Sequence, residues 1–467
     1  MNVYELIRRE NAGRTERAAL RDDRCALSYA ELFERTESMA ARLRELGVKR
    51  ADRTALFCDD GLDYVVASLA ILSLDAVIVP VPPTSAEHET DALLERIGAD
   101  WLLYDVALTE RGGRALDVEP AGGRRLGLTP GPGGKAPEGF AALRPAFIRF
   151  SSGTTGCSKG VVLSHETIVE RTDAADKGLG ITPDDVVLWV LSMSYHFVVS
   201  ILLFLRRGAT IRLCRDDFPT GLRRALAEGE GTFIYAAPFH YHLLASSENV
   251  APEASSRVRM AVSTSMKLPP ETARLFAEKF GFGLTEAYGI IEVGLPFVQR
   301  AEERMEGSVG RLLPDYEIRL EHPDADGIGE ILLRGRGTFD AYYSPWRPFG
   351  PEEWFATGDL GRLDAAGRLF IVGRKKSVVN FMGMKVFPEE VEAVLDAHPA
   401  VRESLVGGEP HPRYGQLPAA RVVCEGDVDE GELVAHCLRE LAPHKVPKRF
   451  DFVESLPRTP SGKLKRS

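Results

Sequence analysis

The stretch RFSSGTTGCSKGVVLSH, Arg149 to His165, places glycines, hydroxyl side chains and a lysine between two apolar runs. Glycines allow backbone N–H groups to point at an anion, and Ser and Thr hydroxyls add donors. Lys159 adds a mobile positive charge. Ser158 precedes this lysine and Gly160 follows it, so the stretch is not a Walker loop, which needs GxxxxGK[ST]. It predicts a phosphate-binding loop of another kind; taken alone, a flexible turn with a surface lysine is the alternative.

Composition and charge narrow the class of protein. The chain has 467 residues, of which 44% are hydrophobic and 27% charged, as in soluble proteins of one to four domains. The net charge is −10, without a block of like charges. Non-specific nucleic-acid binding and polybasic membrane anchoring both need a basic surface, so we expect neither.

Three further features indicate a cytoplasmic protein. The N-terminal MNVYELIRRENAGR lacks the apolar core of a secretory signal. The longest apolar run, residues 64–83, contains Asp75 and ends in prolines, so we expect a buried helix followed by a strand, and no membrane span. The six cysteines are scattered without a CxxC pair, which predicts neither a disulfide scaffold nor a structural zinc site.

The N-terminal part of the chain predicts alternating helices and strands. In residues 27–48 apolar side chains recur at helical period, Ser28 and Glu31 have capping-box spacing, and Gly47 stands where the helix should end. Strand-like apolar runs follow at residues 53–59, 75–81 and 100–106. This alternation indicates an α/β sheet with parallel strands.

The later part of the chain reads differently. The Gly- and Pro-rich residues 119–139 predict a surface connection. Residues 317–337 and 361–375 predict antiparallel hairpins, and residues 388–401 and 429–441 predict helices. We therefore expect a large N-terminal domain at 1–361, with α/β sheets and a β-rich subdomain, and a small α+β C-terminal domain at 362–467.

Five stretches together resemble the motifs of the adenylate-forming superfamily, which holds acyl-CoA synthetases, peptide-synthetase adenylation domains and firefly luciferase. SSGTTGCSKG is similar to the phosphate loop of that superfamily. The later motifs follow in the family's order: YGIIE at 288–292, TGD at 357–359, GRKKSVVNFMGMKVFPEEVE at 373–392 and LPRTPSGKLKR at 456–466. Because they span most of the chain in one order, the resemblance is specific. It implies that the small C-terminal domain is mobile.

The resemblance implies an ATP site with Mg²⁺. The residues implied to bind ATP are Ser151, Ser152, Gly153, Thr154, Thr155, Gly156, Lys159, Tyr288, Gly289, Asp359, Arg374 and Lys463. Glu292 is implied to bind Mg²⁺, a hard cation that prefers carboxylate oxygen and would bridge phosphates. Lys463 is implied to be catalytic, because an ammonium on a flexible stem can reach the α-phosphate and the attacking carboxylate. Taken singly, Asp359 could be a turn residue and Lys463 part of a lysine-rich terminus, and Lys465 is a weaker candidate for the catalytic role.

A second set of implied residues concerns the acid and the acceptor. LSMSYHFVVS, residues 191–200, aligns with the segment that shapes the acyl pocket, and it contains no acid that could pair with an α-ammonium group. The implied substrate-binding residues are Tyr195, His196, Phe197 and Gly289. His196 resembles the aromatic or histidine gate residue of acyl-CoA synthetases, and it is implied to be catalytic together with Glu292 and Lys463. The alternative is a buried core histidine whose hydrogen bonds are satisfied within the protein. Asp364 matches the hinge position, and Gly383 lies where the family turns a loop toward a pantetheine thiol.

The implied function is that of an ATP-dependent carboxylic acid ligase. It would form an acyl-AMP with release of pyrophosphate and transfer the acyl group to the phosphopantetheine thiol of CoA or of an acyl carrier protein. An acyl or aryl acid is favoured over an α-amino acid. Ile291 replaces the usual threonine of its motif, which leaves a non-catalytic nucleotide-binding relative as an alternative. Luciferase-like oxidation of an acyl-adenylate is the second alternative function.

Overall fold

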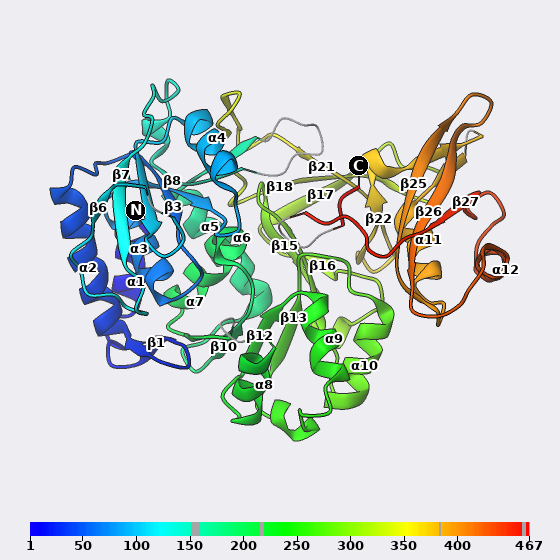
Figure 1. Ribbon diagram of the computed structural model, residues 1–467, viewed down its shortest axis with the longest axis horizontal. Coiled ribbons are helices and arrows are strands. Elements are labelled where there is room, and N and C mark those ends of the chain that lie inside the picture. The colour runs from blue at the N-terminus through cyan, green and yellow to red at the C-terminus, as the bar shows by residue number, and fades with distance from the viewer. Residues whose placement is uncertain (110, 151–158, 215–218, 383, 460–463, 467) are drawn as a thin grey trace.

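The computed structural model describes residues 1–109, 111–150, 159–214, 219–382, 384–459 and 464–466. Two nine-stranded sheets form the N-terminal body, a four-stranded sheet follows, and a smaller α+β part ends the chain (Figure 1). The expected fold class is confirmed. In Figure 1 the C-terminal elements, orange to red, lie to one side of the four-stranded sheet.

The first nine-stranded sheet contains the predicted parallel strands. In spatial order its strands are β20 (Arg347–Pro348), β19 (Ala341–Tyr342), β9 (Gly160–Ser164), β8 (Pro145–Phe150), β4 (Val77–Val81), β3 (Arg53–Phe57), β5 (Trp101–Asp105), β7 (Leu126–Pro130) and β6 (Arg114–Ala115). β3 pairs in parallel with both β4 and β5. The strands predicted at 53–59, 75–81 and 100–106 are thus confirmed. β8 and β9 flank the predicted phosphate loop.

The second nine-stranded sheet is parallel through its middle. In spatial order its strands are β16 (Arg311–Leu312), β15 (Gly294–Val298), β14 (Thr285–Ile290), β13 (Met260–Ser263), β12 (Phe233–Ala236), β10 (Val186–Trp189), β11 (Thr210–Leu213), β1 (Ala18–Arg21) and β2 (Ala26–Ser28). The run from β1 to β14 is parallel, whereas β15 returns antiparallel to β14. The β14–β15 return carries the YGIIE motif.

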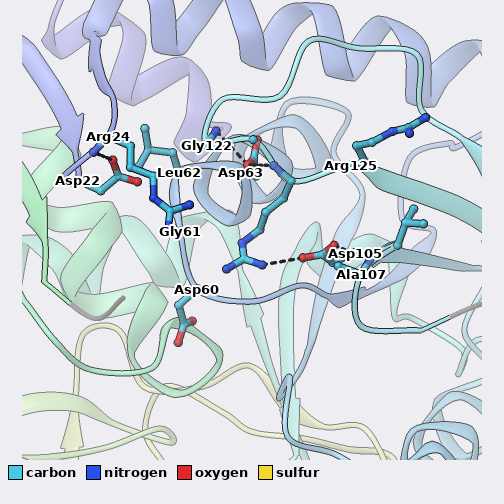
Figure 2. Close-up of a pocket in the computed structure, with 13 residues that line it drawn as sticks. Asp22, Arg24, Asp60, Gly61, Leu62, Asp63, Asp105, Ala107, Gly122 and Arg125 are labelled. Atoms are coloured by element: carbon cyan, nitrogen blue, oxygen red, sulfur yellow. Dashed lines mark hydrogen bonds and ion pairs between the residues drawn. The ribbon is translucent and has the colours of Figure 1, made fainter. Parts of the chain in front are cut away.

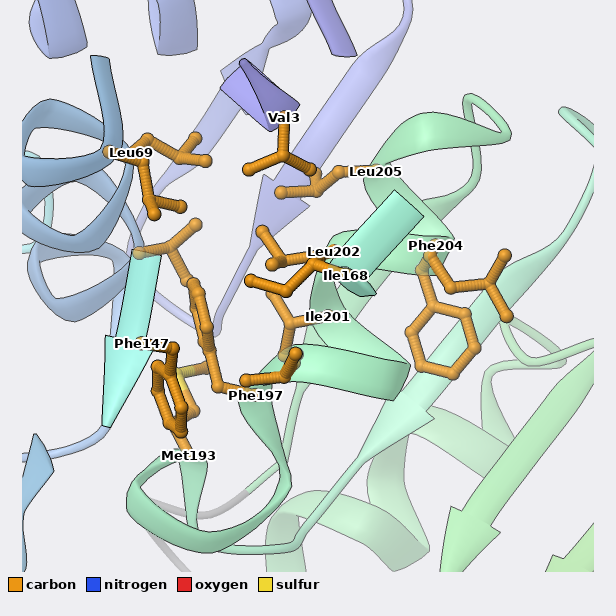
Figure 3. Close-up of a cluster of buried hydrophobic side chains, with 14 of the residues drawn as sticks. Val3, Leu69, Phe147, Ile168, Met193, Phe197, Ile201, Leu202, Phe204 and Leu205 are labelled. Carbon is orange, nitrogen blue, oxygen red and sulfur yellow. The ribbon is translucent and has the colours of Figure 1, made fainter. Parts of the chain in front are cut away.

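Helices pack between and around these two sheets. They are α1 (Val3–Glu10), α2 (Tyr29–Glu45), α3 (Leu62–Ser73), α4 (Glu87–Ile97), α5 (His165–Leu179), α6 (Met193–His196), α7 (Leu202–Arg206), α8 (Thr220–Ala227), α9 (Pro238–Ser246) and α10 (Pro270–Phe280). Figure 3 shows Val3, Leu69, Ile168 and Leu202 meeting in the main core. α3 is buried from Leu62 to Leu72 and leads to β4, so the predicted buried helix and strand are confirmed.

The capping box predicted for α2 is present. The Ser28 hydroxyl accepts a hydrogen bond from the Glu31 backbone N–H (3.2 Å), and Glu31 Oε2 accepts one from the Ser28 N–H (2.7 Å). Gly47, just beyond the helix, has φ of 107°, a conformation that favours glycine. Local sequence signals therefore set both ends of this helix.

The remaining elements form two smaller layers. The four-stranded antiparallel sheet is ordered β17 (Tyr316–Glu321), β18 (Gly329–Gly335), β21 (Phe355–Leu363) and β22 (Leu369–Arg374), which confirms both predicted hairpins. The C-terminal part contains β23 (Val379–Phe381), β24 (Met384–Val386), α11 (Pro388–Leu395), β25 (Val401–His411), β26 (Gly415–Cys424), α12 (Glu430–Glu440) and β27 (Arg449–Phe452). The expected boundary between residues 361 and 362 falls inside β21, and the sheet to which β21 belongs ends at Arg374.

The prediction of a surface connection over residues 119–139 was wrong in part, because β7 lies inside it. Asp63, in the first turn of α3, accepts hydrogen bonds from the backbone N–H groups of Ala121, Gly122 and Arg124. This anchor leads the chain directly into antiparallel pairing with β5. The glycines and prolines marked the turns correctly but concealed the short strand between them.

Two expectations drawn from composition can be compared with the structure. Within the described ranges, no helix is long and apolar enough to cross a bilayer. The five described cysteines are free thiols, namely Cys25, Cys58, Cys214, Cys424 and Cys437. Cys157 lies outside the described residues.

The capping box can be tested by removing one hydroxyl. Ser28→Ala should lower the free energy of unfolding by about 1 kcal/mol, because the N–H of Glu31 loses its acceptor. Urea unfolding followed by circular dichroism measures the change. Ser38→Ala, at an exposed position in the middle of the same helix, is the matched control and should be neutral or slightly stabilising. Equal destabilisation by both substitutions would contradict the capping role.

Candidate active site

Three residues predicted to bind ATP meet at one carboxylate. Tyr288 of β14 donates its hydroxyl proton to Asp359 Oδ2 on β21, and Arg374 Nε of β22 lies 2.7 Å from Asp359 Oδ1. Asp359 and Arg374 are direct partners in the β21–β22 ladder, and Asp359 is only 4% exposed. Burial raises the pKa of Tyr288 and the neighbouring carboxylate raises it further, so the phenol stays a donor at neutral pH.

Glu292 lies in the return between β14 and β15, in a positively charged environment. Burial raises the pKa of Glu292, while the guanidinium groups of Arg149, Arg171 and Arg374 oppose that shift and favour the carboxylate form. Its own carbonyl oxygen accepts a hydrogen bond from the Phe339 N–H (2.7 Å). The predicted metal-binding residue is thus held close to basic side chains on three separate elements.

The residues around Glu292 fit Mg²⁺ as part of a metal–phosphate complex. In the described part of the chain, no group of three or more His, Cys, Asp or Glu side chains could hold a metal ion. Mg²⁺ is commonly bound by one or two carboxylates together with substrate phosphates and water. One carboxylate beside arginines that attract phosphate suits this mode better than an all-protein cage.

The acyl-pocket segment contacts the same region. The Arg149 guanidinium donates to the Tyr195 carbonyl (2.5 Å) and lies 5.6 Å from the centre of the Tyr195 ring. The His196 ring nitrogen Nε2 is 3.3 Å from the Ser265 hydroxyl. Phe197, by contrast, is only 1% exposed; it packs edge-on against Tyr64 and lies with Met193 in the core (Figure 3). The structure therefore brings Tyr195 and His196 near the site and places Phe197 behind them.

One carboxylate near this segment was not found by sequence reasoning. Asp60, in the loop between β3 and α3, accepts a hydrogen bond from the Met193 N–H (2.7 Å) at the start of α6. More than a hundred residues separate the two in sequence, and although Met193 lies in the predicted acyl-pocket segment, Asp60 belongs to no predicted motif. Only the packing of α3 against the acyl-pocket segment reveals this contact.

Three other predicted residues have clear local roles. A Cβ added at Gly289 would lie 2.6 Å from the Gly294 carbonyl oxygen, so the β14–β15 pairing itself requires this glycine. Lys159 Nζ lies 4.7 Å from the centre of the Tyr342 ring. Asp364 closes the β21–β22 turn by accepting from the Ala366 and Arg368 N–H groups, each at 2.9 Å.

The remaining predicted residues lie outside the described ranges, so their roles stay predictions. They are Ser151, Ser152, Gly153, Thr154, Thr155, Gly156, Gly383 and Lys463. The chain on either side of Lys463 is anchored. Leu464 pairs with Arg458 in an isolated β-bridge, and Arg466 Nη1 donates to Glu392 Oε1 (2.7 Å).

A polar cavity of about 440 Å³ lies at the carboxyl ends of β3 and β5 (Figure 2). Asp63 in its wall holds the three backbone N–H groups described above, and Arg124 binds Asp105 (2.9 Å) and Asp59 (2.7 Å). Much of its polar lining is thus paired within the protein, and its lining includes none of the residues implied for ATP, acid or thiol. We assign it a structural role in anchoring the loop that leads to β7.

Comparison with protein families identifies the chain. The family described as AMP-binding enzyme matches residues 7–343, and the AMP-binding enzyme C-terminal domain matches residues 390–463. The chain therefore belongs to the AMP-binding enzymes, the adenylate-forming superfamily that its motifs resemble. Several of its named relatives are CoA ligases, among them the two described next.

Two curated relatives illustrate the similarity. The chain is 34% identical over 339 residues to the sulfoacetate–CoA ligase of Cupriavidus necator, an alignment that covers 69% of this chain and 66% of the relative. It is 27% identical to 4-coumarate–CoA ligase 5 of Oryza sativa subsp. japonica, with 99% of this chain and 93% of that enzyme covered. The chain thus spans just under two thirds of the first relative and nearly all of the second.

Solved structures support the same fold. ATP-bound MatB from Rhodopseudomonas palustris superposes with a TM-score of 0.86 at 27% identity, covering 99% of this chain and 97% of MatB. The o-succinylbenzoate CoA synthetase MenE from Bacillus subtilis, in complex with its acyl-adenylate intermediate, superposes with a TM-score of 0.82 at 26% identity. The superposition covers 98% of this chain and 96% of MenE. The TM-score to apo MatB is lower, at 0.74, so this chain is more similar in structure to ATP-bound MatB than to apo MatB.

The carboxylate at the centre of the site provides a direct test. Asp359→Asn keeps the shape but removes the charge, so the Kd for ATP should rise by about 10- to 100-fold, matching the 1.5–3 kcal/mol of a hydrogen bond to a charged group. Isothermal titration with ATP measures the change. Glu317→Gln, which removes a surface carboxylate paired with Arg334 in the same sheet, is the control and should leave the Kd unchanged. An unaltered Kd in Asp359→Asn would remove this residue from the nucleotide site.

Proposed function

We propose that the chain activates a carboxylic acid without an α-ammonium group as an acyl-AMP and transfers the acyl group to a pantetheine thiol. The thiol belongs to CoA or to the phosphopantetheine of a carrier protein. The meeting of Tyr288, Asp359 and Arg374 beside Glu292 is the observation that carries the proposal, because it joins a nucleotide-binding carboxylate to a metal-binding one.

The first half-reaction joins two anions. A carboxylate oxygen of the acid attacks the α-phosphorus of ATP, the bond from that phosphorus to the bridging oxygen breaks, and pyrophosphate leaves. The protein must neutralise charge and align the groups in line. When bound, Mg²⁺ supplies positive charge to the phosphates. Glu292 would hold it, and Asp359 would accept hydrogen bonds from the ribose hydroxyls.

The second half-reaction forms the thioester. The thiolate of the acceptor attacks the acyl carbonyl carbon, the bond to the phosphate oxygen breaks, and AMP leaves. The proposal includes a division into two domains after residue 361 and a hinge at Asp364. It also places Gly383 beside the path of the acceptor thiol. CoA use is supported by the named relatives, whereas a carrier protein is supported only by the family resemblance.

The nature of the acid follows from charge. Arg149 places a guanidinium on the carbonyl of Tyr195, inside the segment proposed to line the acyl pocket. Asp60 contacts the same segment but is engaged with the Met193 N–H at its start. A substrate ammonium beside Arg149 would meet a like charge. Sulfoacetate and 4-coumarate, the acids named for two relatives, both lack an α-amino group.

Two alternatives are disfavoured. Ile291 in place of a threonine raises the alternative of a non-catalytic relative, yet Glu292, Asp359 and Arg374 are all present and brought together. Luciferase-like oxidation would need oxygen to react with the adenylate. Oxygen uptake or light emission during acid-dependent ATP consumption would favour it over thioester formation.

The terminal lysine can be tested by separating the half-reactions. Lys463→Ala should lower acid-dependent ATP–pyrophosphate exchange by a factor on the order of 10² or more, as loss of one charge contact to a transition state does elsewhere. Thioester formation from supplied acyl-adenylate should continue. Lys465→Ala, which removes an exposed lysine two residues away, is the control for both assays. Near-normal exchange in Lys463→Ala would contradict its assignment.

The substrate class can be tested with a panel of acids. Pyrophosphate release should be faster with aliphatic, aromatic and sulfonated carboxylic acids than with α-amino acids of matched size, because a buried unpaired ammonium is costly. The panel is run with and without CoA, so that adenylation and thioester formation are scored separately. An α-amino acid as the best substrate would show that the acyl pocket has been misinterpreted.

A further inference from the structure

A fully buried arginine lies directly behind the metal-binding glutamate. Arg171, on α5, has no exposed surface, and it belongs to none of the motifs that identify the family. Burial lowers its pKa to about 10, so the guanidinium remains charged at neutral pH. A buried charge is costly unless its donors are satisfied. The partners of this side chain therefore indicate what it does.

Arg171 binds two backbone carbonyls on separate segments. Nη1 donates to the Ile291 carbonyl oxygen (3.0 Å), and both Nε (3.0 Å) and Nη2 (2.5 Å) donate to that of Gly337. The Ile291 carbonyl belongs to the peptide that joins Ile291 to Glu292. The guanidinium thus connects the segment carrying the glutamate to the segment that follows β18.

The surroundings leave the side chain little freedom. A Cβ at Gly337, where φ is +81°, would lie 2.5 Å from the Arg171 Cβ, and one at Gly294 would lie 3.4 Å from it. Phe339, two residues after Gly337, donates its N–H to the Glu292 carbonyl. The peptides before and after Glu292 are therefore both tied to residues 337–339, one of them through Arg171.

We propose that Arg171 is a positioning residue for Glu292, holding its peptide so that the carboxylate is presented to the metal–nucleotide complex. The inference rests on the proposed metal-binding role of Glu292. Arg171 contacts the backbone carbonyl of residue 291, so this contact does not depend on the isoleucine side chain there. The rigid planar fork of arginine can reach both carbonyls at once, which the single ammonium of lysine cannot do as well.

The test measures metal binding separately from catalysis. Mn²⁺ serves as the probe, and its binding in the presence of ATP is followed by electron paramagnetic resonance. Arg171→Met should weaken this binding by about 10- to 100-fold, the usual effect of removing a group that orients a metal ligand. Arg171→Lys should weaken it less. Should Arg171→Met fail to fold, the lysine variant carries the same test.

A matched control separates positioning from general stability. Arg206, on α7, is 3% exposed and packs against the same helix through the Thr172 hydroxyl and the Val169 carbonyl. It pairs with Glu10 and Asp173 and contacts nothing at Glu292 among the described residues. Arg206→Met should therefore lower the melting temperature without changing Mn²⁺ binding. Equal weakening of Mn²⁺ binding in Arg206→Met and Arg171→Met would overturn the inference.

A double-variant cycle shows whether Arg171 acts through Glu292. Glu292→Gln alone should weaken Mn²⁺ binding, and adding Arg171→Met should weaken it little further, because both changes affect one ligand. Additive losses, or wild-type affinity in the folded arginine variants, would overturn the inference and leave the proposed function intact. Absence of ATP-dependent Mn²⁺ binding in the wild-type chain would instead overturn the role of Glu292 and this inference with it.

Discussion

The buried carboxylate of Asp359 connects parts of the chain that otherwise belong to different sheets. Tyr288 reaches it from the second nine-stranded sheet, and Arg374 reaches it from the neighbouring strand of the four-stranded sheet. Asp359 is buried whereas Arg374 is half exposed, so loss of Tyr288 or Arg374 would leave the buried carboxylate without part of its compensation. The relative position of the two sheets near the proposed nucleotide site is therefore coupled to a single charged group.

Positive charge is concentrated at the site although the chain as a whole is acidic. Arg149, Arg171 and Arg374 come from β8, α5 and β22, and all three act on Glu292. Arg171 is satisfied by carbonyl oxygens, whereas Arg374 is paired with a carboxylate. Arg149, like Arg171, donates to a backbone carbonyl, so two of the three guanidinium groups are held without a carboxylate partner that would neutralise them. Such a field suits a reaction between a carboxylate and a polyphosphate.

Motif order singled out the described residues that the structure brings together at the candidate site, and short-range signals predicted many of the elements. The positions of Tyr288, Asp359 and Arg374 followed from resemblance, and the ends of α2 followed from its capping residues. The sequence could not show that Phe197 faces the core, because neighbours in an apolar run differ only in the direction they point. β7 was missed because its pairing depends on the distant anchor at Asp63. Arg171 was missed because nothing local distinguishes a buried arginine on a helix from an exposed one.

The free thiols of the chain matter for the proposed reaction, because its acyl-adenylate intermediate is an acylating agent. Burial raises the pKa of Cys58 and Cys214, the latter to about 12, and it also raises the pKa of Cys437, to about 11. Cys25 and Cys424 are shifted in the same direction. The thiolate is the reactive form, so these five side chains remain protonated at neutral pH and are weak nucleophiles. An acyl-adenylate that escapes before transfer would therefore find poor competitors among them, and self-acylation at these positions would be slow.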